Sequence, residues 1–386
     1  MKKQLNQAID NIIHDLWKMS KQLYENPELG DQEFKSMQVL TDFLKKHDFE
    51  IETGIVERPT AFKAEFHSEK PGPKIAYLAE YDALPGVGHG CGHNLIGTMS
   101  TGAGVALSKL VKETGGSVIV LGTPAEETNG AKVPMSEQGT FDDIDVAMIV
   151  HPGDVSNESG ESLAMDAIQF SYSGKSAHAA ASPEQGINAL DSVIQLFNGI
   201  NALRQHVTSD VRIHGIISEG GQAANVVPDN ATAQFYVRAK DREYLDEVVK
   251  KVKNIAEGAA LMTGASLEVS NYELSYDNMI TNQVLSDRYT ENLKLTSKYP
   301  VLPAKESYGS IDMGNVSQVV PAIHPYIGMN KPGLIHHTTQ FAEQTVTEEG
   351  KQALHDGALS LAQTGFDVLT DKALFKAIQE EFSQSS

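Results

Sequence analysis

The chain of 386 residues is long enough for about two domains, each with its own hydrophobic core. Its formal net charge of −20 disfavours nucleic acid and anionic membranes as partners, because phosphate groups would be repelled. The single cysteine, Cys91, excludes an intrachain disulfide, and no signal peptide or membrane span is evident, so we expect a cytoplasmic protein.

The N-terminal part of the chain combines helical and strand patterns. Apolar residues recur at helical spacing over residues 5–23, and a second amphipathic stretch covers residues 32–46. Strands are expected at residues 60–66 and 74–81. Residues 94–112 are rich in glycine, alanine and serine, which predicts a helix that packs closely against a sheet.

Three short apolar runs, each typical of a buried strand, end in side chains that can bind metal ions. Residues 75–81 lead into Asp82 and the loop H-G-C-G-H-N, residues 117–122 lead into T-P-A-E-E, and residues 146–150 lead into His151. In open α/β sheets, sites lie just beyond the carboxyl ends of parallel strands. We therefore expect a thiol, imidazoles and paired carboxylates to meet at one edge of a sheet.

After these runs the pattern changes to strand–helix–strand–strand–helix–strand, the order of a ferredoxin-like domain. It predicts an inserted domain at residues 166–278 within a discontinuous domain of residues 1–165 and 279–386. The expected fold is α/β, with a mixed, mostly parallel sheet flanked by helices and an inserted α+β domain. The expected elements here are strands at 167–173, 211–218, 231–239 and 265–273 and helices at 186–205, 242–262, 345–364 and 371–382.

Cys91 lies between two glycines, with His89 and His93 close by in the same loop. A lone cysteine is more often a small buried apolar residue than a ligand. In this loop, however, thiolate and imidazole form a donor pair suited to zinc and its neighbours. The rival interpretation is a nucleophilic cysteine with a histidine base, but it leaves Glu126, Glu127 and the distant histidines unexplained.

Adjacent glutamates, Glu126 and Glu127, follow the second apolar run. Such a pair is usually a solvated acidic patch. On a strand-to-loop turn the two side chains diverge, so that one can bind metal while the other faces the attacking water. We assign Glu127 as a ligand and Glu126 as the general base that later protonates the leaving amine.

Further histidines and one aspartate complete the predicted site. His151 follows the third strand, which favours a ligand over a histidine at the edge of the core. His336 or His337 would supply a ligand from the far end of the chain, although either can be an ordinary loop residue. Asp82 would orient a ligand histidine or bind metal itself, if it does not simply shape the turn before Pro85.

The inserted domain offers His178, Asn225 and Arg238. His178 lies among small residues and could donate a hydrogen bond to an oxyanion; the alternative is an exposed loop histidine. Arg238, on an expected strand, could hold a substrate carboxylate; more often such an arginine covers a sheet face. Asn225, in the loop G-G-Q-A-A-N, is also expected to bind substrate.

At this point the motifs resemble a known family of co-catalytic, metal-dependent amidohydrolases and exopeptidases that includes aminoacylase and carboxypeptidase G. The resemblance is strongest to the branch of aminobenzoyl-glutamate hydrolase, indole-acetyl-amino-acid hydrolases and small-dipeptide hydrolases. It spans nearly the whole chain. The motifs are N-P-E-L-G at 26–30, Y-D-A-L-P at 81–85, G-H-G-C-G-H-N at 88–94, A-E-E at 125–127, A-H-A-A-A-S-P at 177–183 and D-M-G-N-V-S at 312–317.

The resemblance implies a zinc-exopeptidase-like fold with two divalent metal ions. Zn²⁺ is our first choice, with Mn²⁺ or Co²⁺ as alternatives. The resemblance also implies a lid domain that forms homodimers, or a larger tetramer. This lid would lend His178 to the partner's active site. Many members of the wider family have a histidine ligand where this chain has Glu80. The implied ligands are Cys91, His93, Glu127, His151 and His337, with Glu126 as the base.

The predicted function is therefore the hydrolysis of an amide bond in a small N-acyl or N-aminoacyl amino acid or a short peptide. The alternative, from another class, is a noncatalytic and metal-free scaffold or peptide-binding protein with the same fold.

Overall fold

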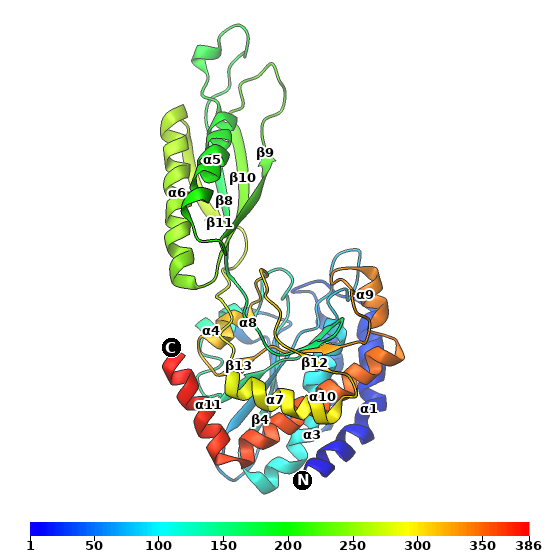
Figure 1. Cartoon of the computed structure of the whole chain (residues 1–386). Coiled ribbons are helices and arrows are strands. Elements are labelled where there is room, and N and C mark those ends of the chain that lie inside the picture. Colours follow the sequence, from blue (N-terminus) through cyan, green and yellow to red (C-terminus); the bar gives the residue numbers. More distant parts are fainter. Residues whose placement is uncertain (386) are drawn as a thin grey trace. The chain divides into compact units, whose positions relative to one another are not determined.

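The computed structural model describes residues 1–385, which form two compact units (Figure 1). Compared with the expected boundaries, residues 162–165 and 308–311 join the smaller unit, because the Leu163 N–H donates a hydrogen bond of 2.9 Å to the Gly309 carbonyl oxygen. Unit 1 contains Met1–Glu161, Met279–Ser307 and the chain from Asp312 onward, and unit 2 contains Ser162–Asn278 and Tyr308–Ile311.

A six-stranded sheet in the order β1-β2-β4-β3-β5-β13 forms the centre of unit 1. The strands β4, β3, β5 and β13 are parallel, and β2 and β1 continue the sheet in antiparallel pairing. The parallel strands are almost entirely buried, as expected for continuous apolar runs. This confirms the mixed, mostly parallel sheet. The strands are β1 Glu50–Thr53, β2 Phe62–His67, β3 Lys74–Ala79, β4 Ser117–Gly122, β5 Val146–Met148 and β13 Ala322–Ile323.

The small-residue helix predicted at 94–112 is α3 (His93–Thr114), which packs along β3 and β4. A Cβ at Gly97 would lie only 2.7 Å from the Glu80 carbonyl oxygen, and one at Gly104 only 2.5 Å from a methyl group of Val120. Glycine therefore allows α3 to approach the sheet closely, which anchors its first turn beside the end of β3.

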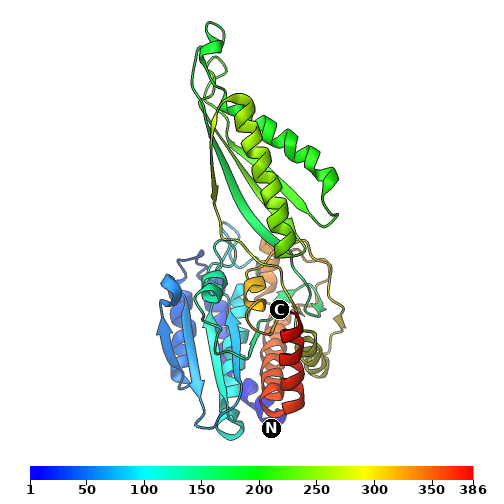
Figure 2. The same cartoon turned by 90° about the vertical axis from the view of Figure 1, so that its left-hand side faces the viewer.

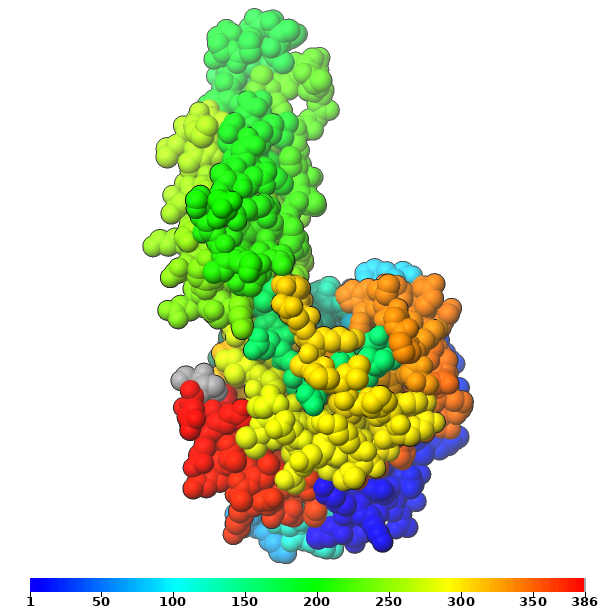
Figure 3. Space-filling model, in the orientation of Figure 1, coloured from blue at the N-terminus to red at the C-terminus, as the bar shows by residue number. Residues whose placement is uncertain are grey.

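Other helices enclose α3 and the sheet. The helices α1 (Lys2–Glu25) and α10 (Glu348–Thr370) pack against α3, and α7 packs against α10. On the face drawn in Figure 3, the yellow atoms of α7 border the red atoms of α11. The remaining helices of four or more residues in unit 1, within the described chain, are α2 Phe34–Lys46, α4 Lys132–Glu137, α7 Gln283–Thr296, α8 Met313–Ser317, α9 Thr339–Gln344 and α11 Lys372–Ser385.

A second, smaller sheet in unit 1 has the order β12-β7-β14-β6. Its strand β6 starts at His151, which pairs in parallel register with Tyr326 of β14. His151 is therefore held at the point where the chain leaves one sheet and enters the next. The strands are β6 His151–Gly153, β7 Ser156–Asn157, β12 Val301–Leu302 and β14 Tyr326–Gly328.

Unit 2 has the predicted ferredoxin-like order, β8-α5-β9-β10-α6-β11. Its strands form one antiparallel sheet in the order β11-β8-β10-β9, and α5 and α6 cover the same face of it (Figure 2). Alternate residues of β10 are buried, as expected for a sheet with one open face. The elements are β8 Ala164–Ser173, α5 Ala189–Leu203, β9 Arg212–Glu219, β10 Asn230–Ala239, α6 Arg242–Thr263 and β11 Ser266–Asn271.

Two helices start three residues later than expected from the sequence, and capping explains both. The helix expected from residue 186 starts at Ala189, because the Asn188 side chain accepts hydrogen bonds from the next turn. The helix expected from residue 345 starts at Glu348, where Thr347 is the cap. Within residues 1–385, none of the helices combines the length and apolar character needed to cross a membrane.

Candidate active site

The carboxyl ends of β3, β4 and β5 meet at one edge of the central sheet, because the three strands are parallel. Asp82 follows β3, Glu126 and Glu127 follow β4, and His151 follows β5. The loop after β3 adds Cys91, whose sulfur lies 3.3 Å from His151 Nε2. The structure thus brings together side chains from three separate segments of the chain.

Three groups of side chains at this edge could hold a metal ion, each with donor atoms within 4.8 Å of one another. Two of the groups share Cys91, so that its sulfur belongs to two candidate sets of metal ligands. The third shares His93 and Glu127 with the other two and adds Glu126. The groups are Cys91–His93–His151, Cys91–Glu127–His337 and His93–Glu126–Glu127.

Asp82 orients two of these side chains. Its Oδ1 lies 2.8 Å from His93 Nδ1, and its Oδ2 accepts a hydrogen bond of 3.0 Å from the Glu127 N–H. Because Nδ1 donates, His93 Nε2 is the nitrogen left to bind a cation. Both oxygens of Asp82 are engaged by protein groups, which favours the orienting role over direct metal binding.

Charge sets the protonation of this pair. Burial alone would raise the pKa of Asp82 and lower that of His93. The attraction between the two side chains opposes burial in each case, so the pKa of Asp82 is held below its usual value and that of His93 well above it. The aspartate is therefore ionised over the neutral pH range.

Two buried atoms that could bind a metal ion lie at this edge of the sheet. Among the described residues, His93 Nε2 and Glu127 Oε1 lie buried 4.0 Å apart with no hydrogen-bond partner. Such unpaired atoms are costly in a folded protein. A divalent cation would satisfy both, and the donor set of thiolate, imidazole and carboxylate suits zinc and its neighbours. The residues therefore fit a metal centre.

The turn between Cys91 and His93 depends on a glycine. Gly92 has a φ of 84°, and a Cβ there would lie 2.4 Å from a carbon of the Pro152 ring. Burial raises the pKa of the Cys91 thiol well above its usual range, so a cation is needed to favour the thiolate. His151 Nδ1 lies 2.7 Å from the Pro152 carbonyl oxygen, and this leaves its Nε2 facing the sulfur.

Glu126 lies within reach of the same centre, with Oε2 4.0 Å from His93 Nε2. Burial, and then the nearby carboxylates of Glu80 and Asp312, raise its pKa well above the usual value. A carboxyl group with a raised pKa can accept a proton and return it, which general acid–base catalysis requires.

A fully buried lysine behind the site was missed by sequence reasoning. Lys132 Nζ lies 2.7 Å from Glu80 Oε1 and 2.7 Å from Asp312 Oδ1. The second oxygen of Glu80 lies 3.4 Å from His93 Nε2. Glu80, where the family resemblance implied a histidine ligand, is thus paired with a lysine. The D-M-G-N-V-S motif marked Asp312, but the local sequence around Lys132 gave no sign of burial.

The three other histidines of unit 1 that the sequence singled out have different surroundings. His337 Nε2 lies 3.4 Å from Glu127 Oε2, and its side chain is 58% exposed. The ring of His336 instead packs on Phe341, and its Nε2 lies 3.2 Å from the Pro152 carbonyl oxygen. His89 Nε2 lies 3.2 Å from a carbonyl oxygen of α1, and among the described residues His89 belongs to none of the donor groups.

His178 and Asn225 lie together in loops of unit 2. The Ala179 N–H donates a hydrogen bond of 3.0 Å to the Asn225 carbonyl oxygen. His178 is exposed, and its Nδ1 accepts from the N–H groups of Ala180 and Ala181 at 3.3 and 3.2 Å. Its Nε2 therefore carries the proton and is free to donate.

Arg238 lies near the C-terminal end of β10, whereas the loop that contains Asn225 precedes the N-terminal end of this strand. Arg238 and His178 therefore lie far apart within unit 2. Arg238 lies eight residue steps along the strand from Asn230, a distance of about 26 Å. Its Nη1 donates to the Tyr308 carbonyl oxygen at 3.1 Å, and its guanidinium lies 5.6 Å from the centre of the Tyr236 ring. Its role in substrate binding stays a prediction.

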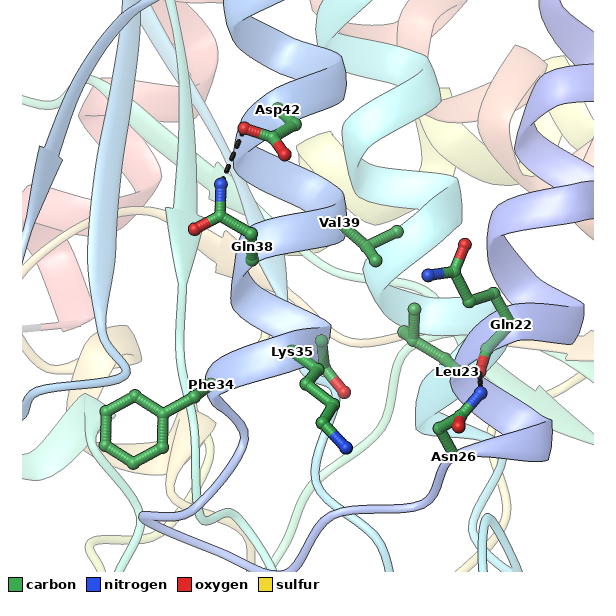
Figure 4. Close-up of a pocket in the computed structure, with 9 residues that line it drawn as sticks. Gln22, Leu23, Asn26, Phe34, Lys35, Gln38, Val39 and Asp42 are labelled. Carbon is green, nitrogen blue, oxygen red and sulfur yellow. Dashed lines mark hydrogen bonds between the residues drawn. The ribbon is translucent and has the colours of Figure 1, made fainter.

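A separate hollow of about 500 Å³ lies between the end of α1 and the start of α2 (Figure 4). Several of its polar side chains pair with the protein itself: Gln38 donates to Asp42 at 2.6 Å, and the Asn26 amide donates to the Gln22 carbonyl oxygen at 2.9 Å. We assign it no function. It is lined by Gln22, Leu23, Asn26, Phe34, Lys35, Ser36, Gln38, Val39 and Asp42.

Comparisons with known proteins agree with the fold. Residues 167–262 match the model of the peptidase dimerisation domain. The mouse Xaa-Arg dipeptidase is 34% identical over 399 residues, covering 99% of this chain and 92% of that protein. One of the subunits of the p-aminobenzoyl-glutamate hydrolase of Escherichia coli is 33% identical over 70% of this chain and 60% of that protein.

A solved structure shows the same fold. The YXEP protein of Bacillus subtilis, described as a dinuclear metal-binding peptidase of the M20 family, superposes with a TM-score of 0.68 and 22% identity. The match covers 92% of this chain and 99% of that one. Fold and site together define a metal-dependent hydrolase of amide bonds. The chain belongs to the M20 peptidase family.

These findings confirm the predicted family, the fold class and the metal-dependent hydrolysis of an amide bond. They give no support to a noncatalytic scaffold. The domain assignment, the roles of individual residues and the identity of the metal stay predictions.

Proposed function

We propose that the protein is a metal-dependent dipeptidase, with dipeptides that end in a cationic residue as its first candidate substrates. The observation that carries this proposal is the position of the Cys91 sulfur, shared by two groups of metal-binding side chains. The substrate class is supported by the Xaa-Arg dipeptidase relative, which aligns with 99% of the chain. A net charge of −20 would also attract cationic peptides.

The proposed ligands would hold two divalent cations, with Zn²⁺ as the first choice and Mn²⁺ or Co²⁺ as alternatives. When bound, the ions polarise the scissile carbonyl group and lower the pKa of water. The Cys91 sulfur could serve as a ligand in either of its two donor groups. A cytoplasmic location stays a prediction, and it suits a chain whose single cysteine must remain reduced to bind metal. The ligands are Cys91, His93, Glu127, His151 and His337.

Glu126 would move the protons. Its carboxylate accepts a proton from the attacking water and then donates it to the nitrogen of the leaving amine. Asp82 supports this step from behind, because it holds His93 Nδ1 and the Glu127 N–H at the same time. The two glutamates would thus have different roles, with Glu127 as a metal ligand and Glu126 as the group that exchanges the proton.

Unit 2 would act as a lid and dimerisation domain. His178 would donate from Nε2 to the oxyanion that forms at the scissile carbonyl, beside Asn225. Arg238 would hold the substrate carboxylate. Because about 26 Å of strand separates Arg238 from the loops of unit 2, far more than the length of a dipeptide, His178 and Arg238 would reach one substrate from different subunits.

The edge strand β9 is the proposed contact between subunits. Ile216 and Ile217, both on this strand, are 61% and 44% exposed. An apolar edge strand that stays unpaired is prone to pair with another chain. We propose a homodimer through this edge, with a tetramer as the larger alternative.

The test combines a substrate screen with one conservative variant. Protein stripped by a chelator and reloaded with Zn²⁺, Mn²⁺ or Co²⁺ is given dipeptides, N-acetyl amino acids and aminobenzoyl-glutamate, and the products are identified by mass spectrometry. Glu126→Gln should keep its metal and lose about 10²–10⁴-fold in kcat. Near wild-type turnover in a Glu126→Gln protein of normal metal content would exclude the proposed mechanism.

A further inference from the structure

The N-P-E-L-G motif at residues 26–30 has no role in the chemistry described so far. It lies between α1 and α2, and its backbone runs beside the end of β3. The Ala83 N–H donates a hydrogen bond of 2.8 Å to the Glu28 carbonyl oxygen, and Leu29 forms a β-bridge with Ala83. The segment therefore lies next to Asp82 and close to the metal-binding edge.

Glu33, three residues beyond this motif, is completely buried. Its Oε1 accepts a hydrogen bond of 2.9 Å from the Ala125 N–H, and its Oε2 accepts one of 2.9 Å from the Thr60 hydroxyl. Ala125 directly precedes the glutamate pair. One carboxylate thus joins the start of α2, the loop before β2 and the turn after β4.

That turn has an unfavourable backbone conformation. Ala125 has a φ of 63°, in the left-handed region that residues with a Cβ rarely adopt. Such a conformation persists only where the surroundings impose it. Packing supplies one restraint, because a Cβ on Gly30 would lie 3.0 Å from the Ala125 Cα and 2.7 Å from the Thr128 hydroxyl. The hydrogen bond to Glu33 supplies the other.

The position of Glu33 is costly in itself. Burial, and then the neighbouring carboxylate of Asp82, raise its pKa to about 7. A buried carboxyl group of this kind destabilises a protein unless its contacts are valuable, and an apolar residue would fill the core at lower cost. The geometry around Ala125 identifies what the contacts achieve.

We propose that Glu33 is a positioning residue, whose hydrogen bond to the Ala125 N–H holds the turn that directs Glu126 and Glu127 apart. The inference rests on the proposed function for the roles of those two glutamates. A purely structural Glu33 would affect stability alone. A positioning Glu33 also affects the geometry of bound metal and the rate of turnover.

The test uses three substitutions at one position. In Glu33→Gln the amide oxygen can still accept from Ala125 and the amide nitrogen can donate to the Thr60 oxygen, so metal geometry and kcat should stay within about 3-fold of the wild type. Glu33→Ala removes both bonds. Glu33→Asp keeps the charge but is one methylene shorter, and it serves as the variant that folds if Glu33→Ala does not.

For Glu33→Ala and Glu33→Asp we expect a 10–100-fold loss in kcat or in Co²⁺ affinity, the range typical of residues that orient metal ligands, with KM changed by less than about 3-fold. The visible absorption spectrum of the Co²⁺-loaded protein should change with them. The hydrogen exchange of peptides that cover residues 123–127 should become faster in the metal-free protein. Unchanged exchange and an unchanged Co²⁺ spectrum would overturn the proposal.

Glu28 provides the matched control. Its carboxylate caps α2, accepting from the Lys35 N–H, the Ser36 N–H and the Ser36 hydroxyl at 3.2, 2.8 and 2.9 Å. Glu28→Ala should lower the thermal midpoint without changing the Co²⁺ spectrum. An equal change in both variants would mean that the whole segment loosens, and the specific role of Glu33 would be rejected.

The readouts separate this inference from the proposed function. A wild-type protein that hydrolyses no dipeptide refutes the substrate assignment, and the Co²⁺ spectra still decide the role of Glu33. A wild-type protein that binds no Co²⁺ refutes the metal site. Hydrogen exchange at residues 123–127, compared between Glu33→Ala and Glu28→Ala, then decides whether Glu33 holds the turn.

Discussion

The Cys91 sulfur lies 3.3 Å from His151 Nε2, although 60 residues separate the two in the sequence. They follow two parallel strands of the central sheet, β3 and β5, and meet because these strands end at the same edge. Cys91 also belongs to the donor group with Glu127 and His337. A single side chain therefore links the two halves of the proposed metal centre.

Replacing this residue should affect both proposed ions together. We expect Cys91→Ser to retain less than about one ion per chain and to lose at least about 100-fold in activity, because a hydroxyl is a poor replacement for a shared thiolate. Elemental analysis gives the metal content. A nucleophilic cysteine predicts the opposite pattern, with full metal content in Cys91→Ser and activity that survives removal of metal from the wild type.

Lys132 is the next test, because it holds two buried carboxylates. Lys132→Met leaves Glu80 and Asp312 without their cation, and we expect it to destabilise the fold by about 3–5 kcal/mol in chemical denaturation. The control is Lys305→Met, whose partner Asp154 lies 2.9 Å away but whose own side chain is 60% exposed. That change should cost less than about 1 kcal/mol. Equal losses of stability in the two variants would contradict the structural role of the buried ion pairs between Lys132 and its two carboxylates.

Much of this arrangement could be predicted from the sequence, because strand ends are marked locally. Apolar runs followed by Asp82, Glu126 and His151 predicted one shared edge from pattern alone. His337 was harder, since His336 is its neighbour and either could have been the ligand. The structure separates them through a φ of 62° at His337, which turns the two rings toward different partners.

Glu33 and Lys132 could not be found in this way. Each looks like an ordinary charged residue in its own stretch of chain, and its burial depends on contacts with distant segments. Sequence periodicity reports which face of an element is apolar, but it does not report which polar side chain is enclosed when loops meet. Likewise, the sequence singled out Arg238 and His178 without revealing that most of a strand separates them.

The buried carboxyl group of Glu33 predicts a pH effect with a definite sign. Its pKa is about 7 in the folded protein and 4.5 as the ordinary value, so the folded state retains the proton over this interval while the unfolded state has lost it. Unfolding then releases protons, and stability falls as pH rises from about 4.5 to 7.

The comparison of wild type with Glu33→Gln isolates this contribution. In metal-free protein, the free energy of unfolding of Glu33→Gln minus that of the wild type should increase with pH by up to about 3 kcal/mol and level off above pH 7. Urea unfolding at several pH values measures it. A difference that stays constant with pH would show that Glu33 titrates normally in the folded protein.

Gly30 should tolerate no side chain, because it packs directly on the turn before the glutamate pair. A Cβ there would lie 2.7 Å from the Thr128 hydroxyl and 3.0 Å from the Ala125 Cα. We expect Gly30→Ala to cost about 1–3 kcal/mol of stability and to reduce turnover. Gly258→Ala, in α6, is the control. No described residue outside its own helix segment lies within 4 Å of a Cβ there, so it should stabilise by up to about 1 kcal/mol.

The exchange of His178 between subunits can be tested by mixing two inactive proteins. Glu126→Gln lacks the proposed base but retains His178, whereas His178→Ala retains the base. If each site takes His178 from the partner, a mixed dimer contains one complete site. After subunit exchange at equal concentrations, half of the dimers are mixed, and about a quarter of the wild-type activity should return.

A further substitution in both proteins provides the control for dimerisation. Ile216→Asp places a charge on the exposed edge strand β9, and it should convert the dimer to a monomer in light scattering. When both inactive proteins also carry Ile216→Asp, mixing should restore no activity. Dimers that restore no activity would mean that His178 serves the site of its own chain or no site. Restored activity in proteins that carry Ile216→Asp would mean that β9 is not the contact between subunits.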